Sequence, residues 1–377
     1  IFNIVTYFRE KSEIEPYIIS FSYVIKMLDA AQKLIKLPGG ADGVLKEDIQ
    51  RMTKLRAHLA KLEKGAFLVL YGGGSLGGDP LSIVMDYVKM TFHLDLIQFN
   101  RMLAFLRKNI AEVDEVNTIL GRLEAAISIA SFRRSLEKQN GYCIPVLKEG
   151  KAGALVMTEG YHPLLKEPIK NSITVSKGVL ITGSNASGKS TFLKTVAINA
   201  ILAQTIYTCT AKSYEASYYR IYSSMALRDD VESGESYYIV EIKALQRILN
   251  AISSDKRPVL CFVDEVLRGT NTVERIAAST QVLKSLCGEN VTCFAATHDI
   301  ELTQLLEKEY ENYHFEEEIA DGDVIFPYLL LQGKATTRNA IKLLEIMGYD
   351  EEIVQRANDM AKRFTDTGVW DASLDGK

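Results

Sequence analysis

The sequence contains no uninterrupted apolar run long enough to span a bilayer, and no signal peptide opens it. We therefore expect no membrane-spanning segment in this chain and a cytoplasmic location. The first of the 377 residues is Ile1 rather than methionine, which is consistent with a fragment. Whether a membrane anchor precedes this part in a longer protein stays open.

Cysteine is scarce and has no C-x-x-C spacing, which argues against a zinc site. Scattered cysteines are typical of a reducing cytosol rather than of a disulfide framework. Several of them lie in apolar runs that look like strands, where a buried free thiol is expected. The five cysteines are Cys143, Cys209, Cys261, Cys287 and Cys293.

A surplus of positive charge is also missing, because 44 Lys and Arg stand against 48 Asp and Glu. Composition therefore gives no global signature of nucleic-acid binding, although a local basic face would suffice for DNA. Hydrophobic residues make up 47% and charged residues 24%, enough for a well-filled core without metals or disulfides. The length suggests two or three domains.

A phosphate-binding loop is the most informative feature that the sequence does contain. Residues 183–191 match G-x-x-x-x-G-K-[ST] at every fixed position, a pattern that chance gives in roughly one chain of this length in a hundred. The apolar stretch Val179–Thr182 before the loop predicts a strand, and apolar residues at helical spacing after it predict a helix. Loop N–H groups and the helix dipole would then converge on an anion.

The residues of this loop have expected roles in binding a nucleotide with Mg²⁺. Lys189 would bridge the β- and γ-phosphates, and the Ser190 hydroxyl would coordinate Mg²⁺. Glycine is required where the backbone curls tightly around the phosphates. The predicted nucleotide-binding residues of the loop are Gly183, Ser184, Asn185, Ala186, Ser187, Gly188, Lys189, Ser190 and Thr191.

Two adjacent acids end a second apolar strand, residues 258–263, in the manner of a Walker B element. Ligands of parallel sheets bind at the carboxyl ends of the strands, so both carboxylates are expected at that edge. Asp264 would hold Mg²⁺, and Glu265 would orient and deprotonate the attacking water. The alternative is an acid pair at a strand end that faces solvent.

A third such strand, Val291–Ala295, leads to His298, which is predicted to sense the γ-phosphate or the attacking water. The loop Ser233–Ser236 precedes a helix expected to begin near Tyr237. This serine loop either caps that helix or offers a serine and the helix N-terminus to a nucleotide, including one held by another subunit. The other histidines are interpreted as structural or surface residues: His58, His93, His162 and His314.

The pattern as a whole predicts an α/β P-loop NTPase domain, with a mostly parallel sheet and flanking helices, preceded by a mainly α-helical domain. We expect the helical domain at residues 1–140 and the P-loop NTPase domain at 141–377. Residues 66–71 are compatible with a buried strand or a helical turn. The glycine-rich residues 72–80 lack a lysine and are expected to be a linker rather than a second phosphate loop. Asp350 is a plausible N-cap for the helical tail.

Read together, several blocks of this chain resemble the MutS family of mismatch-repair ATPases. The resemblance covers roughly residues 120–360, and the order and spacing of its blocks are highly specific. Asp230 is a single residue that also matches the family pattern. The matching segments are Ala126–Ala130, Glu159–Leu164, Thr182–Thr191, Ser233–Glu241, Val263–Thr272 and Ala296–Thr303.

The resemblance implies an ATPase with Mg²⁺ that works as a homodimer with composite sites. Ser236 of one subunit would reach the nucleotide of the other, and the helical tail, residues 338–365, would be a dimerisation segment. Asn185 and His298 lie where the family has its loop asparagine and its switch histidine. ATP binding would close the dimer, and the cycle would move helical levers around DNA or another partner.

The chain also departs from the family pattern. It has no mismatch-reading N-terminal domain and no Phe-x-Glu wedge, so mismatch reading transfers least well, and Ile169 is aliphatic where the family often has an aromatic residue. One alternative is an ABC- or SMC-like ATPase, but no LSGGQ-like signature or long heptad arm is present. Another is a nucleotide-switched scaffold acting on a protein or membrane partner, against which intact Lys189, Asp264 and Glu265 argue.

Overall fold

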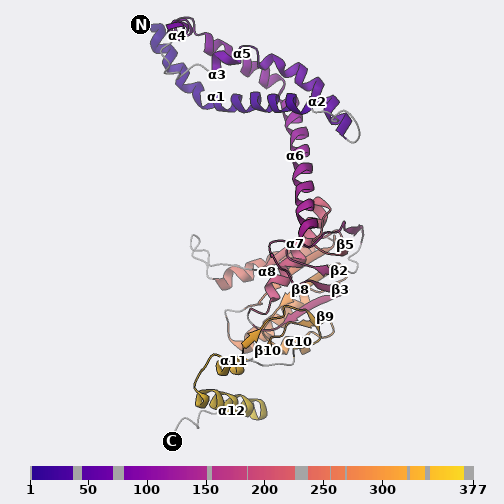
Figure 1. Cartoon of the computed structure of the whole chain (residues 1–377). Helices are drawn as coiled ribbons and strands as arrows, with labels where there is room; N and C mark the ends of the chain where they lie inside the picture. The colour runs from indigo at the N-terminus through magenta and orange to yellow at the C-terminus, as the bar shows by residue number, and fades with distance from the viewer. Residues whose placement is uncertain are drawn as a thin grey trace. The chain divides into compact units, whose positions relative to one another are not determined.

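The structure is a computed structural model that divides into two compact units, Ile1–Ser131 and Phe132–Lys377, which we describe separately (Figure 1). The predicted domain boundary at residue 140 falls just after helix α6 (Ile110–Gln139), whereas the two units divide within that helix. The residues described are 2–36, 45–70, 80–150, 155–184, 186–225, 237–254, 256–267, 270–320, 323–335 and 340–368.

The first unit is helical, as the sequence predicts. Its helices bury one apolar core in which Leu28, Met52 and Ile119 are almost fully buried. Residues 66–70, which the pattern left undecided, form a short helix. The helices are α1 (Phe2–Ile35), α2 (Lys46–Leu59) with a 3₁₀ turn (Ala60–Leu62), α3 (Ala66–Leu70), α4 (Pro80–Phe92), α5 (Leu94–Lys108) and α6.

Helix α1 contains Pro16 in its interior and continues through it as a single helix. A buried polar contact fixes α1 against α5, because the Tyr7 hydroxyl donates a 2.7 Å hydrogen bond to Asp95. Lys11 lies 3.4 Å from the same carboxylate, so the buried charge of Asp95 is paired.

The second unit is built around a six-stranded sheet in the order β12-β9-β4-β8-β7-β6. All neighbours are parallel except the β12–β9 pair at one edge. The three strands expected from the sequence are confirmed as β4, β7 and β8. The strands are β4 (Gly178–Thr182), β6 (Arg220–Ser224), β7 (Val259–Asp264), β8 (Val291–Ala296), β9 (Tyr310–His314) and β12 (Leu331–Gln332).

Helices cover both faces of this sheet, which explains why its strands are apolar throughout. Along β4, Val179 and Ile181 join a core cluster shared with helix α7, whereas Leu180 points into the opposite cluster with residues of α8 and α9. This alternation is the period of two expected of a strand. The helices are α7 (Lys189–Ile206), α8 (Tyr237–Ser254), α9 (Thr272–Ser285) and α10 (Glu301–Leu305).

A smaller sheet in the order β1-β5-β2-β3 packs into the core cluster that also contains residues of α7. The sequence did not predict this mixed sheet. A two-stranded hairpin, β10 with β11, completes the strands that the structure describes. The strands are β1 (Val146–Lys148), β2 (Leu155–Gly160), β3 (Asn171–Val175), β5 (Ser213–Ser217), β10 (Glu318–Ala320) and β11 (Asp323–Ile325).

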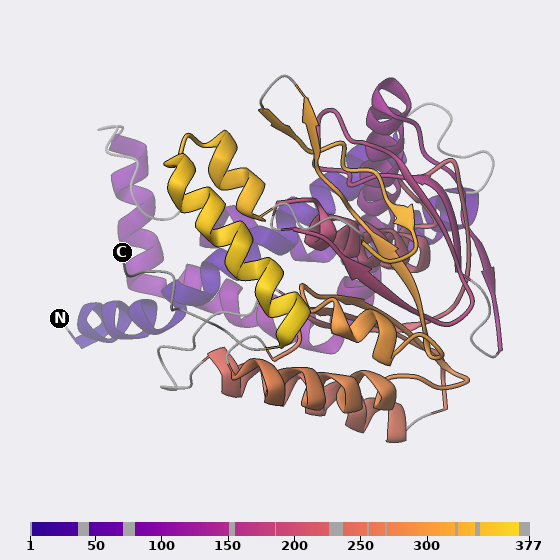
Figure 2. The same ribbon diagram turned by 90° about the horizontal axis from the view of Figure 1, so that it is seen from below.

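The tail is helical over its described part, with α11 (Ala340–Ile346) and α12 (Glu351–Thr367) side by side (Figure 2). The predicted N-cap is confirmed, because the Asp350 side chain accepts a 2.9 Å hydrogen bond from the Glu352 N–H. All five cysteines are free thiols, and Cys209, Cys261 and Cys293 are buried. None of the helices described here combines the length and apolar character needed to cross a membrane.

Arg133 of α6 caps the carboxyl end of α7, whose other end carries the phosphate-binding loop. Its guanidinium donates to the carbonyl oxygens of Ile206 and Tyr207 and, at 2.8 Å, to the Thr208 hydroxyl. Carbonyls at a helix end lack partners within the helix and carry partial negative charge, so a cation there is stabilising.

We predict that Arg133→Ala destabilises the protein by about 1–3 kcal/mol, because it removes a charged donor from partly buried carbonyls. Urea unfolding followed by circular dichroism measures this as a lower midpoint. Arg134→Ala is the matched control, since Arg134 is exposed on the same helix turn. Equal midpoints for the two variants would contradict the capping role.

Candidate functional site

The phosphate-binding loop joins β4 to α7, the strand-to-helix context that the sequence predicted. Gly183 and Gly188 have φ angles of 144° and 108°, values that residues with a side chain rarely adopt. A Cβ on Gly183 would lie 2.5 Å from the Phe315 carbonyl oxygen, so no other residue fits there without movement. Asn185 lies outside the described residues.

Lys189 begins α7 and is almost fully buried, with 5% of its surface exposed. Its Nζ donates hydrogen bonds of 2.8 Å to the carbonyl oxygens of Gly183 and Ser184. The ammonium group is thus held inside the curve of the loop at the positive end of the helix dipole. Two sources of positive potential therefore coincide there.

Hydrogen-bond register aligns the ends of three strands. Ala296 at the end of β8 pairs with Ile181 of β4 on one side and with Asp264 of β7 on the other. Because β8 lies between β4 and β7, the residues that follow it fall between the phosphate-binding loop and the acidic pair. This register brings His298 to the centre of the site.

His298 bridges the loop and the second acid of the pair. Its Nδ1 lies 3.1 Å from the Gly183 carbonyl oxygen, and its Nε2 lies 2.5 Å from Glu265 Oε1. A carbonyl oxygen only accepts, so the Nδ1 contact requires a hydrogen on Nδ1, and the Nε2 contact is a hydrogen bond to the carboxyl group. Glu265 itself has a φ of 58°, a costly backbone conformation for a residue with a side chain.

Two buried polar atoms of the site, Asp264 Oδ1 and Ser187 Oγ, have no hydrogen-bond partner among the described residues. A buried carboxylate oxygen without a partner is costly, and carboxylate and hydroxyl oxygens are ligands that Mg²⁺ prefers. Asp264 and the Ser190 hydroxyl therefore fit a magnesium ion beside a nucleotide. Among the described residues, no cluster of three or more His, Cys, Asp or Glu side chains could hold a metal ion.

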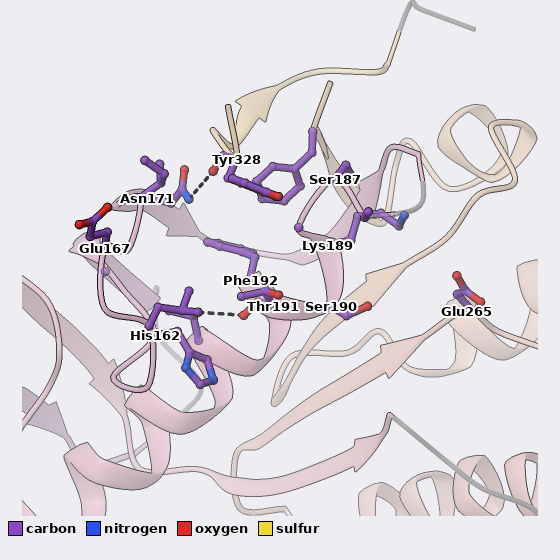
Figure 3. A pocket seen from close by; sticks show the side chains of 17 residues that line it. His162, Glu167, Asn171, Ser187, Lys189, Ser190, Thr191, Phe192, Glu265 and Tyr328 are labelled. Carbon is purple, nitrogen blue, oxygen red and sulfur yellow. Dashed lines mark hydrogen bonds between the residues drawn. The ribbon is translucent and has the colours of Figure 1, made fainter. Parts of the chain in front are cut away.

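A cavity of about 460 Å³ runs along the loop. Figure 3 shows Lys189 and Ser190 on the side nearer Glu265, with Glu167 and His162 toward the opposite end. The cavity is also lined by residues outside the predicted site: Gly160, His162, Leu165, Glu167, Ile169, Asn171 and Tyr328.

Residues 179–365 match the family model described as MutS domain V. This part of the chain belongs to the MutS domain V family. Two curated relatives are named DNA mismatch repair protein MutS: the one from Clostridium kluyveri is 28% identical over 287 residues, and the one from Aquifex pyrophilus is 31% identical over 267 residues. These matches cover 72% and 67% of this chain but only 32% and 30% of the relatives. The chain thus matches about a third of their length.

Within the MutS domain V, the structure brings together most of the residues that the sequence selected. Lys189, Ser190 and Glu265 line one cavity, and His298 contacts both Glu265 and the loop. Ser236 lies outside the described residues, although the helix expected to follow it is present as α8 from Tyr237.

Tyr328 was missed because it follows the loop by well over a hundred residues and belongs to no motif. It lies at the rim of the cavity, where its carbonyl oxygen accepts a 3.0 Å hydrogen bond from the Asn171 side chain (Figure 3). The Asn171 amide oxygen in turn accepts from the Leu330 N–H at 2.8 Å. This pair of bonds closes the segment around Tyr328 onto β3. The sequence could have indicated the position of Tyr328 only if the contact between its segment and β3 had been known.

His162 was interpreted as structural or surface, but it lines the cavity beside the phosphate-binding loop. Its Nδ1 lies 3.3 Å from the Leu164 N–H, which can only donate, so Nδ1 accepts. Burial lowers the pKa of His162, and the positive charge of Lys194 lowers it further. The neutral ring is therefore the form that the fold stabilises.

We predict that stability falls on acidification in part because of His162. The unfolded chain binds this proton with a pKa of about 6.5, above that of the folded state, so stability is lost as pH falls below about 6.5. His162→Asn should therefore reduce the drop in melting temperature between about pH 7.5 and about pH 5.5. His58→Asn, in the other unit, serves as the control. An unchanged drop in His162→Asn would refute the assignment.

Proposed function

We propose that this chain binds ATP with Mg²⁺ and hydrolyses it to ADP and phosphate. The family supports this directly, since MutS domain V is an ATPase domain. The observation that carries the proposal is the bridge of His298 between Glu265 and the Gly183 carbonyl oxygen, because it joins a carboxylate to the loop that would hold the γ-phosphate.

The triphosphate would bind along the loop and the first turn of α7. Lys189 would leave the two loop carbonyls and donate to the β- and γ-phosphate oxygens, where its charge is better compensated. The backbone N–H groups of residues 186–191 would donate to the same anion. Asp264 and Ser190 would hold Mg²⁺, which when bound neutralises charge on the phosphates.

Glu265 would act as the general base. As the water oxygen attacks the γ-phosphorus, Glu265 takes a proton from the water, and the bond from that phosphorus to the bridging oxygen breaks to leave ADP. His298 orients the Glu265 carboxylate through Nε2, and its Nδ1 keeps the ring fixed to the loop. Lys189 stabilises the charge that develops on the phosphate oxygens.

The base would occupy the part of the cavity bounded by Ile169 and by the Tyr328 ring, which lies next to Gly188 of the loop. An aromatic side chain offers a flat face to a purine, and Asn171 keeps the backbone of Tyr328 in place.

The wider function proposed is ATP-driven closure of a homodimer coupled to DNA. The relatives carry the name of a DNA mismatch repair protein, and Ser236 would act in trans on the partner's nucleotide. Residues 338–365 would contribute to the dimer, since α12 exposes Ile353 and Phe364. The same proposal includes a cytoplasmic location. Mismatch reading lies outside it, because the chain matches only about a third of the relatives.

We predict that ATP turnover requires Glu265, whereas nucleotide binding requires Lys189. Glu265→Ala should lower kcat by about 100-fold or more and leave the Kd for a fluorescent ADP analogue within about threefold. Lys189→Ala should weaken that binding by about tenfold or more. Steady-state phosphate release and fluorescence titration measure the two effects.

Glu215→Ala is the control for these measurements, because Glu215 is exposed and pairs with Lys148 away from the cavity. The proposed hydrolysis would be contradicted if the unmodified chain showed negligible ATP turnover and Glu265→Ala had the same rate. This result would favour a nucleotide-switched scaffold instead.

DNA coupling predicts that ATP changes the affinity for DNA. Titration of homoduplex, mismatched and branched DNA at one fixed salt concentration, with and without ATP, measures this. We expect a Kd that differs by about fivefold or more between the two nucleotide conditions for at least one DNA. If the chain bound none of the three DNAs, DNA coupling would be contradicted, and a protein or a membrane would become the favoured partner.

A further inference from the structure

Glu241 is a buried carboxylate that the proposed chemistry does not use. It lies in the second turn of α8, and only 1% of its surface is exposed. A buried carboxylate is costly unless hydrogen bonds or charges compensate it. A role that depends on its acceptor atoms would explain why such a group is present.

The Glu241 side chain reaches the turn that follows β7. Its Oε1 accepts a hydrogen bond of 2.5 Å from the Leu267 N–H. Leu267 has a φ of 56°, and Glu265 two residues earlier has a φ of 58°. Two residues with side chains in left-handed conformation make this turn unfavourable by itself, so other contacts must hold it.

The turn is held at three successive residues. The Glu265 N–H donates to the Ala296 carbonyl oxygen at 2.9 Å, and the Val266 carbonyl accepts from the Ser279 hydroxyl at 3.3 Å. Glu241 provides the third contact, and it is the one made by a carboxylate. A hydrogen bond from a backbone N–H to a charged acceptor is about twice as strong as a neutral one.

We propose that Glu241 is a positioning residue for hydrolysis: it fixes the Leu267 turn and thereby presents the Glu265 carboxylate to His298 and the attacking water. This inference rests on the proposed ATPase function. Glu241 does not touch the nucleotide. It acts through Glu265, and it also ties the catalytic turn to α8, the helix that directly follows Ser236 in the sequence.

The test compares two substitutions of the same length. Glu241→Gln keeps a side-chain oxygen that accepts from the Leu267 N–H, whereas Glu241→Met fills the space with no strong acceptor. We expect Glu241→Met to lower kcat by about 10- to 100-fold, since a displacement of the order of 1 Å at a catalytic group has effects of that size. Glu241→Gln should restore kcat to within about threefold of the unmodified chain.

Nucleotide binding separates positioning from general damage. The Kd for the ADP analogue should change less than about threefold in both variants, because neither the loop nor Lys189 is touched. In a Glu265→Ala background, Glu241→Met should lower the residual rate no further, since it acts through Glu265. Asp95→Asn, at a buried carboxylate of the helical unit, should lower the melting temperature without changing kcat.

The outcomes distinguish this inference from the proposed function. An unmodified chain without turnover overturns both. If the unmodified chain is active and the kcat of Glu241→Met lies within about twofold of its kcat, only the role of Glu241 is overturned. The role of Glu241 is also overturned if Glu241→Gln lowers kcat as much as Glu241→Met does. It is overturned as well if Glu241→Met lowers the rate by the same factor in the Glu265→Ala background as in the unmodified chain.

Discussion

The constraint on which the site depends is the alignment of three parallel strands. Ala296 and Asp264, the last residues of β8 and β7, lie in one row with Ile181, the second-last residue of β4. A slip of one residue in any of these pairs would turn the following side chains to the other face of the sheet. The alignment of these three residues therefore places His298 between the phosphate-binding loop and Glu265.

Backbone strain gathers at the same edge of the sheet. Ala186, Glu265, Leu267 and Tyr328 all have positive φ angles between 55° and 65°. Residues with side chains adopt such angles only when their surroundings hold them. Here the holding contacts come from distant segments, among them Glu241 of α8 for Leu267. The geometry of the site is thus stabilised by the fold around it rather than by the loop sequences themselves.

The sequence predicted those parts of the structure whose determinants are local. The strand Gly178–Thr182, the loop after it and α7 follow from an apolar run, fixed glycines and helical spacing, and the Asp350 cap follows from a helix-start signal. The assignment of the ATPase domain to the MutS family is confirmed by the match of residues 179–365.

The remaining features depend on which segments meet in space, and no local pattern encodes this. The insertion of β8 between β4 and β7 is one such feature, and the mixed sheet of β1, β5, β2 and β3 is another. Tyr328 and Glu241 were missed for the same reason, because each acts on a partner 26 or more residues away. The roles assigned to individual site residues stay predictions.

A crystal structure of the chain with a non-hydrolysable ATP analogue and Mg²⁺ tests the central claim most directly. The account predicts that the Lys189 Nζ leaves the Gly183 and Ser184 carbonyl oxygens for the phosphates, and that Asp264 lies beside the metal ion. An analogue bound away from residues 183–191, or one that leaves Lys189 bonded to those two carbonyls, would contradict it.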